Sequence, residues 1–389
     1  MWQLFALIYS VLVLPPIIYL LCISLLGMRS PPKTRPTSTD KQLAHGRIGV
    51  LIPAHNEKLT IERTISSLLQ AAEKSQDIDI YIIADNCSDN TAELARKTSV
   101  NVLERHNLHL RGKGAALQWA MQMIAEKEYD YTLIVDADSI VNDEFFLALR
   151  HCLHESNSEV VQSRYEALAN EHSSIKRLAM LGFNVLRAKG RVALGGSAGI
   201  MGNGFIVSKA ALAKVPFRAN SIVEDLEYHM RLVESDVKVA FCDEARIYGE
   251  MPNDDAASDI QSSRWEGGRL GVLKAAFSPL LKKSFTGLLK GEFHALDALL
   301  DLMLLPIGYM VLILFAGLLL PATQLIALFG ITVIGIYVLG AAMCGNGLSE
   351  LSVLKKLPIF LIKKITRIPA LLSASSTKTQ WKKTPRKKK

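Results

Sequence analysis

Apolar residues concentrate toward the two ends of the chain, and a more polar stretch lies between them. Residues 2–27 contain no charged side chain, and this run is long enough to cross a lipid bilayer as a helix. Basic residues follow the run rather than precede it, which predicts an uncleaved anchor whose carboxyl end lies in the cytoplasm. We therefore expect a transmembrane anchor over residues 1–28 and a linker over residues 29–46.

The last third of the chain returns to apolar patterns. Two long apolar runs, separated near Pro321, predict a transmembrane hairpin within residues 298–345. Lysines interrupt the leucines on both sides of this hairpin, a pattern typical of helices that lie along a membrane interface. These interfacial segments and a basic tail cover residues 278–297, 346–376 and 377–389. We expect about three transmembrane helices in all, together with the interfacial helices.

Strand-like and helix-like patterns alternate in the middle of the chain. Runs of β-branched and apolar residues predict strands that begin near Arg47, Asp79, Val100 and Thr132. One helical pattern begins at Thr60, a second runs through Lys97, and a third covers residues 115–124. This alternation is typical of a parallel, doubly wound, Rossmann-like sheet. An α/β domain over residues 47–277 is therefore expected.

Acidic side chains end these predicted strands. Glu57 follows the first strand, Asp85 the second, and Asp136 and Asp138 the last. Right-handed crossovers bring successive carboxyl ends to one edge of a sheet, so we expect these carboxylates to line one crevice. Such hard oxygen ligands hold Mg²⁺ or Mn²⁺ together with substrate phosphates. For the aspartate pair taken alone, a solvated turn is the alternative.

A basic glycine turn, Arg111-Gly112-Lys113-Gly114, precedes the predicted helix over residues 115–124. Glycines at the start of a helix let a phosphate approach backbone N–H groups, and Lys113 adds positive charge. The spacing is not that of a Walker loop. A plain glycine turn with exposed basic residues is the alternative.

Together these motifs resemble the nucleotide-sugar half of family-2 glycosyltransferases with the GT-A fold. The matching segments are Val50 to Glu57, Asp85 to Asp89, Arg111 to Gly114, Asp136 to Asp138, Gly202 to Gly204, Val223 to Asp225 and Gln261 to Trp265. The last of them looks like the Gln-x-x-Arg-Trp motif of the cellulose-synthase-like and hyaluronan-synthase-like branch. The resemblance covers the chain from about residue 45 to about residue 275 and implies sugar transfer with inversion at the anomeric carbon.

The resemblance also implies roles for single residues. Asp138 is expected to bind the metal directly, with Asp136 nearer the nucleotide and ribose, and Asp85 at the base. The other expected contacts of the nucleotide sugar are Ala54, Glu57, Lys113, Gln261 and Arg264, with Arg264 at the pyrophosphate. Gly204 and Trp265 are expected on the acceptor side.

Asp225 matches the family's general base, a group that must reach the attacking hydroxyl by a hydrogen bond. Glu224 is expected to support the turn or the acceptor site. Without the resemblance, Glu224 and Asp225 are predicted to form the first turn of a helix. Residues 226–233 have a helical pattern, and acidic side chains are favoured in the first turn of a helix.

Charge and cysteine content exclude other classes of protein. The net charge of +8 does not predict nucleic-acid binding, because much of the basic excess lies beside apolar segments and in the tail, where anionic lipids attract it. The five cysteines are scattered and lack Cys-x-x-Cys spacing, so neither a disulfide framework nor a zinc site is predicted.

Asp297 and Asp301 lie at the start of the predicted hairpin and are interfacial or functional.

We therefore expect a multi-pass enzyme of the inner (cytoplasmic) membrane with its catalytic domain in the cytoplasm. Its expected reaction moves a sugar from a nucleotide-sugar donor, in this family usually a UDP-sugar, to a lipid-linked or membrane-proximal glycan acceptor in exopolysaccharide or cell-surface glycan assembly. One alternative is a processive synthase of the cellulose, hyaluronan or poly-N-acetylglucosamine type, alone or with assembly partners. Another is a non-catalytic membrane scaffold that senses nucleotide sugar.

Overall fold

The computed structural model describes residues 2–29, 45–168, 174–218, 223–251 and 255–366. The predicted linker lies largely outside these residues, and the basic tail lies wholly outside them. The chain divides into two compact units. The helical unit comprises Met1–Pro31, Asn170–Ser197 and Trp265–Ser376, and the sheet unit comprises Pro32–Ala169, Ala198–Arg264 and Thr377–Lys389.

The sheet unit is built on eight strands among the described residues. They are β1 (Ile48–Ala54), β2 (Ile78–Asp85), β3 (Asn101–Arg105), β4 (Tyr131–Ile134), β5 (Ser139–Val141), β6 (Val160–Ala167), β7 (Phe205–Ser208) and β8 (Val239–Gly249). Their order in the sheet is β3-β2-β1-β4-β7-β6-β8-β5. The predicted parallel pairing holds for β3, β2, β1 and β4. Strand β7 pairs antiparallel with β4 and β6, β5 pairs antiparallel with β8, and β6 and β8 are parallel.

Amphipathic helices cover this sheet. They are α2 (Ile61–Ala72), α3 (Thr91–Arg96), α4 (Lys113–Met123), α5 (Phe145–Ser156), α8 (Lys209–Lys214) and α9 (Glu224–Glu234), with a 3₁₀ turn η1 (Ala125–Lys127). Helix α2 buries Ile61, Ile65 and Leu68 at helical spacing in the core beneath the sheet. Before it, the Thr60 hydroxyl donates to the carbonyl of Ala137 at 3.0 Å. The start of α2 therefore holds the loop that follows β4.

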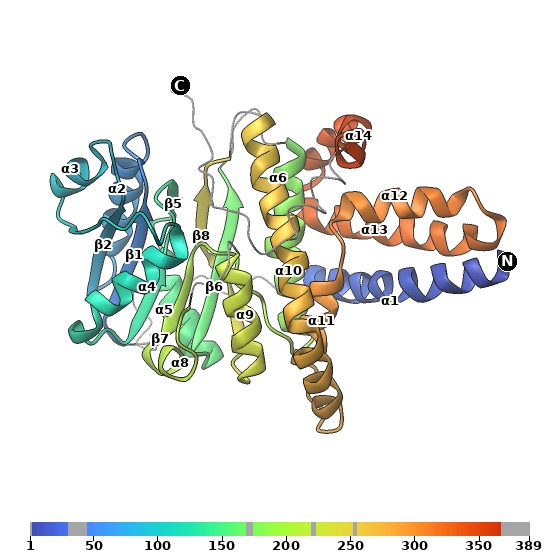
Figure 1. The fold of residues 1–389 in the computed structure, drawn as a ribbon, viewed down its shortest axis with the longest axis horizontal. Helices are drawn as coiled ribbons and strands as arrows, with labels where there is room; N and C mark the ends of the chain where they lie inside the picture. Colours follow the sequence, from blue (N-terminus) through green and yellow to red (C-terminus); the bar gives the residue numbers. More distant parts are fainter. Residues whose placement is uncertain (1, 30–44, 169–173, 219–222, 252–254, 367–389) are drawn as a thin grey trace. The chain divides into compact units, whose positions relative to one another are not determined.

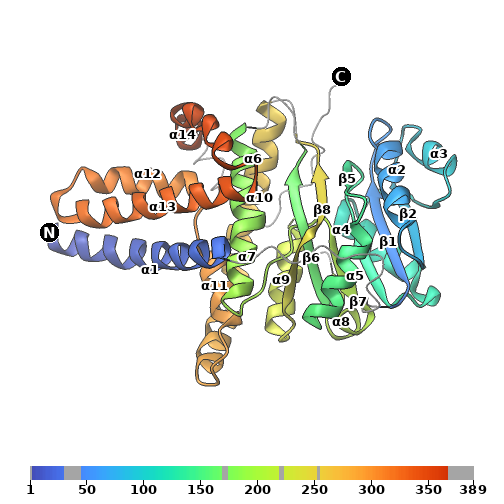
Figure 2. The same cartoon turned by 180° about the vertical axis from the view of Figure 1, so that it is seen from behind.

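Among its described residues, the helical unit contains two long apolar helical segments and one bent pair of apolar helices. Its elements are α1 (Trp2–Arg29), α6 (Ser174–Met180), the π-helical segment η2 (Leu181–Leu186), α7 (Arg187–Ala193), α10 (Asp255–Leu288) from Trp265 onward, α11 (His294–Met303), α12 (Ile307–Leu318), η3 (Pro321–Thr323), α13 (Gln324–Cys344), η4 (Gly347–Lys356) and α14 (Leu357–Thr366). Helices α1, α12 and α13 run side by side (Figures 1 and 2). Within the described chain, α1 and the segment Pro321–Cys344 are long and apolar enough to cross a membrane, and the bent pair α11 and α12 makes a third crossing if it acts as one span.

The helical boundaries differ from the predicted ones. The first run of the predicted hairpin is broken between Met303 and Ile307, where α11 and α12 meet at 69°. Pro306 explains the break, because proline has no N–H and disfavours a helical conformation in the residue before it. Helix α10 passes without interruption through residues 277 and 278, where a boundary was predicted. The predicted interfacial segment over 346–376 is η4 followed by α14, and its residues from 367 onward are outside the described part.

A helical stretch that the sequence pattern did not reveal belongs to the helical unit. Segments α6, η2 and α7 follow one another directly, and α7 packs on α1. A Cβ atom placed on Gly190 would lie 1.9 Å from the carbonyl oxygen of Ile23, and one on Gly27 would lie 2.4 Å from that of Leu186. The two glycines therefore let the backbones of α1 and α7 approach as small residues do in membrane helix pairs.

Candidate active site

The segment with Asp136 and Asp138 follows β4 and is held by Asn203. The Asp136 N–H donates to Asn203 Oδ1 at 3.0 Å, and Asn203 Nδ2 donates to Ser139 Oγ at 2.8 Å. Asn203 is buried, and its own carbonyl accepts from Gln162 Nε2 at 2.8 Å. The loop that presents both carboxylates is thus fixed by a buried amide side chain.

Gly202 and Gly204, on either side of Asn203, have the positive φ values of 76° and 68°. A Cβ atom on Gly204 would lie 2.1 Å from Ser163 Oγ, so this position requires glycine for space as well as for backbone conformation. The Gly-Asn-Gly motif therefore brings Asn203 against the loop after β4. The predicted acceptor role of Gly204 stays a prediction.

Lys113, the first residue of α4, points at the aspartate loop. Its Nζ donates to Asp136 Oδ1 at 2.5 Å and also to the carbonyl of Gly202. Burial acts to lower the pKa of Lys113, but the carboxylates of Asp136, Glu224 and Asp225 outweigh it, so the pKa lies above its ordinary value. The glycine turn thus supplies one firmly protonated ammonium group to an acidic site.

Asp225 and Glu224 form the first turn of α9, as their pattern predicted, and both are half-buried. Asp225 lies against the backbone of Gly202, since a Cβ atom there would be 2.5 Å from Asp225 Oδ2. Burial raises the pKa of Asp225, Asp136 adds to the rise, and Lys113 opposes it. A carboxyl group with a raised pKa takes up a proton more readily, which suits a general base.

Asp85 ends β2 and is buried in an ion pair. Arg105 donates to Asp85 Oδ1 at 2.6 Å and to the carbonyl of Leu110 at 2.7 Å. His55 Nδ1 donates to the main-chain carbonyl of Asp85 at 2.7 Å. Arg105 was not among the predicted site residues. The signal for it is the register of the parallel pair β2 and β3, which places Arg105 opposite Asp85.

The other predicted contacts from the first strand are less directly engaged. Ala54 ends β1 and is buried, and its carbonyl accepts from Cys87 Sγ at 3.4 Å. Glu57 is half-buried, and its carboxylate lies 3.2 Å from the Thr60 hydroxyl oxygen beside the start of α2. The structure therefore places Ala54 at the expected strand end and turns Glu57 toward α2.

The Gln-x-x-Arg-Trp segment lies within α10. The side chains of Gln261 and Arg264 fall outside the described residues, so their predicted roles are not tested. Trp265 belongs to the helical unit, and 42% of it is exposed. The structure thus brings together Lys113, Asp136, Gly202 and Asp225, and it leaves the Gln-x-x-Arg-Trp residues as expectations.

The acidic side chains fit a hard divalent cation. Asp136 and Asp138 are half-buried carboxylates on one short loop, and Asp225 and Glu224 add negative charge around a single ammonium group. Carboxylate oxygens are the ligands that Mg²⁺ and Mn²⁺ prefer. Asp136 and Asp138 are the residues that would hold such an ion.

The fold and this site define an α/β protein of the GT-A-like class, with an acidic loop at the carboxyl end of a parallel strand. The chain belongs to glycosyltransferase family 2, because the profile described as "Glycosyltransferase like family 2" matches residues 45–268.

Curated relatives cover part of the chain. The poly-β-1,6-N-acetyl-D-glucosamine synthase of Staphylococcus aureus (strain COL) is 28% identical over 249 residues, which are 61% of this chain and 58% of that protein. The β-monoglucosyldiacylglycerol synthase of Trichormus variabilis is 27% identical over 194 residues, 48% of this chain and 41% of that protein. The chain thus aligns with less than two thirds of the length of these relatives.

A solved structure shares the fold over nearly the whole length. The mannosyltransferase PcManGT from Pyrobaculum calidifontis, solved with GDP-Man and Mn²⁺, matches with a TM-score of 0.57 at 14% sequence identity, covering 96% of this chain and 98% of that one. At this identity the likeness shows the fold alone.

Proposed function

We propose that this protein is a membrane-bound glycosyltransferase that moves a sugar, with inversion, from a nucleotide-sugar donor to a lipid-linked or membrane-proximal glycan acceptor. The expected donor is a UDP-sugar and the expected process is assembly of an exopolysaccharide or cell-surface glycan. The observation that carries this proposal is the meeting of Lys113, Asp136 and Asp225 at the backbone of Gly202. The carboxylate proposed for the donor side, Asp136, and the carboxylate proposed for the acceptor side, Asp225, both lie close to Gly202.

In the proposed reaction, Asp225 accepts the proton of the acceptor hydroxyl while that oxygen bonds to the anomeric carbon. The bond from the anomeric carbon to the diphosphate oxygen breaks on the opposite face, and the nucleoside diphosphate leaves with the bonding electrons. Asp136 and Asp138 would hold Mg²⁺ or Mn²⁺, which when bound stabilises the charge of the departing diphosphate. Lys113 keeps Asp136 in position and adds a positive charge at the donor side.

Other roles in the proposal rest on the family resemblance. Asp85, held by Arg105, is proposed to contact the base, and Arg264 the pyrophosphate. The remaining proposed contacts are Ala54, Glu57 and Gln261 for the donor and Gly204, Trp265 and Glu224 for the acceptor. The mannosyltransferase that shares this fold was solved with GDP-Man and Mn²⁺, which are of the same chemical classes as the proposed donor and ion.

A membrane location is proposed from the helical unit. Helix α1 and the segment Pro321–Cys344 have the length and apolarity of membrane spans, and the bent pair α11 and α12 adds a third if it acts as one span. The basic residues after α1 support a cytoplasmic location for the sheet unit under the positive-inside rule. The exposed apolar residues Phe285 and Leu289, next to Lys283 and Lys290, support an interfacial position for the end of α10.

Processive polymer synthesis is the second candidate. The similarity to a poly-β-1,6-N-acetyl-D-glucosamine synthase favours it, whereas the similarity to a glucosyldiacylglycerol synthase favours a single addition to a lipid. The sensing scaffold has less support, because the donor-side and acceptor-side carboxylates are both present. The length of the product separates the two enzyme candidates.

The test is release of nucleoside diphosphate by the detergent-purified full chain, measured over a panel of UDP- and GDP-sugars with Mg²⁺ or Mn²⁺ and a membrane lipid extract. Turnover with one donor is expected, together with its loss on chelation. Asp225→Asn is expected to lower kcat by about 10²- to 10⁴-fold. Glu227→Gln removes the same charge from the same helical turn and is the matched control. Donor binding without turnover in any condition would contradict the proposal.

A further inference from the structure

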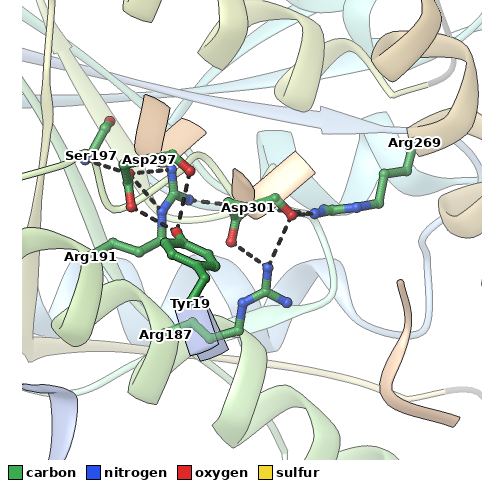
Figure 3. A network of polar contacts seen from close by, with 7 residues as sticks. All are labelled: Tyr19, Arg187, Arg191, Ser197, Arg269, Asp297 and Asp301. Carbon is green, nitrogen blue, oxygen red and sulfur yellow. Dashed lines mark hydrogen bonds and ion pairs between the residues drawn. The ribbon is translucent and has the colours of Figure 1, made fainter. Parts of the chain in front are cut away.

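Three arginines and two aspartates are packed together inside the helical unit (Figure 3). Arg187 and Arg191 come from α7, Arg269 from α10, and Asp297 and Asp301 from α11. The side chains are between 1% and 13% exposed. With three guanidinium charges against two carboxylates, the cluster holds one positive charge in excess.

Asp297 is fully occupied within the cluster. Arg191 approaches Asp297 Oδ2 at 2.9 Å and 3.0 Å through two nitrogens. The Tyr19 hydroxyl donates to Asp297 Oδ1 at 2.7 Å, and the Ser197 N–H donates to Oδ2 at 3.3 Å. Arg191 is therefore engaged by this carboxylate, and its Nη1 also lies 3.4 Å from Asp301 Oδ2.

Arg187 and Arg269 share Asp301 with Arg191. Arg187 pairs with Asp301 Oδ1, while Arg269 donates to the Asp301 carbonyl and reaches Oδ2 only at 3.5 Å. Burial, with repulsion from the other two arginines, lowers the pKa of Arg269 to about 10. Arg187 Nε is buried and has no hydrogen-bond partner among the described residues. Arg187 also interacts with the Tyr337 hydroxyl, and both guanidinium groups retain donor capacity that the aspartates do not use.

An exposed aromatic ring lies beside these unused donors. The Phe183 ring centroid is 4.5 Å from Arg187 Cζ and 5.7 Å from Arg269 Cζ, and Phe183 is 36% exposed. Phe183 belongs to the π-helical segment η2, and π-turns inside helices are frequent at functional sites. The apolar ring of Phe183 therefore lies next to two guanidinium groups in the helical unit.

We propose that Arg187 and Arg269 bind the phosphate group of a membrane lipid, with Phe183 against its apolar part. A guanidinium presents parallel N–H donors that match phosphate oxygens, and a bound phosphate neutralises the excess charge. Soluble phosphate has the same headgroup chemistry, so the experiment compares both sources. The site does not depend on the proposed sugar transfer, because every residue in it belongs to the helical unit and its readout is binding.

The experiment uses the detergent-purified full chain with three probes: phosphatidylglycerol, diacylglycerol with the same acyl chains, and inorganic phosphate. Lipid retained in native mass spectrometry and the shift of the thermal midpoint are measured. Phosphatidylglycerol is expected to bind and stabilise, and diacylglycerol is not. Arg269→Gln is expected to weaken phosphatidylglycerol binding by about tenfold or more. Lys274→Gln removes one exposed positive charge from the same helix and is expected to change nothing.

Stabilisation by inorganic phosphate that is lost in Arg269→Gln would support the anion site and assign it to a soluble ligand. Equal binding of phosphatidylglycerol to the wild type and Arg269→Gln overturns the proposal. Equal weakening by Lys274→Gln also overturns it, because the binding is then non-specific attraction to basic helices. If Arg269→Gln does not fold, Arg269→Lys is measured instead, because it keeps the charge and lacks the paired N–H donors of arginine. Arg269→Lys is expected to bind phosphatidylglycerol several-fold more weakly than the wild type, and unchanged binding rejects the site.

Discussion

Asp225 lies where burial and two neighbouring charges act on one carboxyl group. Burial and Asp136 favour its protonated form, and Lys113 favours the ionised form. The resulting pKa is above the ordinary value of aspartate, which is about 3.9. A base must be ionised to act, so the proposed activity is present above this raised pKa and is lost as the pH falls through it.

The pH profile of kcat/KM tests this balance. Replacing Lys113 by Met removes the charge that lowers the pKa of Asp225, so we expect the acidic limb of the profile to move to higher pH. Lys209→Met removes an exposed lysine of the same unit and is expected to leave the limb in place. A limb that stays unchanged in Lys113→Met would show that another group controls it.

The ion pair between Asp85 and Arg105 makes a second residue-level prediction. Arg105→Gln leaves a buried carboxylate without its partner, so a loss of about 3–5 kcal/mol of stability is expected. Arg96→Gln breaks an exposed pair with Glu104 and is expected to cost at most about 1 kcal/mol. Thermal unfolding midpoints measure both. Adding Asp85→Asn to Arg105→Gln should restore part of the loss, and purely additive losses would contradict the pairing.

The acidic residues of the site could be predicted because a carboxylate at the end of an apolar strand is visible in the sequence. The sequence did not predict Arg105, nor that Asn203 fixes the loop after β4. Arg105 is defined by the register between two strands, and Asn203 by contacts across more than sixty residues, at Asp136 and Ser139. Partners that are distant in sequence are set by the packed fold and leave no local pattern.

At the level of elements, hydrophobic periodicity predicted the first four parallel-paired strands and their helices. It missed the stretch from α6 to α7, where the buried Gly190, Arg187 and Arg191 interrupt apolar residues such as Val185 and Leu186. It also missed the antiparallel insertion of β7, because a strand as short as Phe205–Ser208 does not specify its partners. The break at Pro306 was hidden by an otherwise continuous apolar run.

The close contact of α1 and α7 can be tested with two glycines. Gly190→Ala places a methyl group against the Ile23 carbonyl, so we expect the helices to separate and stability to fall by about 1–3 kcal/mol. Gly335→Ala, on α13, meets no atom within 4 Å and should be neutral or stabilising by up to about 1 kcal/mol, because alanine favours helix. Thermal unfolding in detergent compares the two variants, and equal midpoints would rule out the tight contact.

At the scale of the whole molecule, the helical unit is assembled from three separate stretches of the chain. Deleting residues 1–29 removes α1 and leaves α12 and α13, so the shortened protein is expected to stay with membranes after alkaline washing. Its thermal midpoint should fall below that of the full chain, since α7 and α13 lose the helix on which both pack. A soluble, equally stable product would contradict this organisation.

The same arrangement has a consequence for biosynthesis. Tyr9 on α1 donates to the carbonyl of Ile313 on α12, a residue 304 positions later. At about 5–20 residues per second, the ribosome needs on the order of 15–60 s to make that partner. During this interval α1 lacks its contacts with α12 and α13 while the sheet unit is synthesised. A nascent chain released before residue 344 still lacks a complete α13, so its first helix is left without the last one that it packs against.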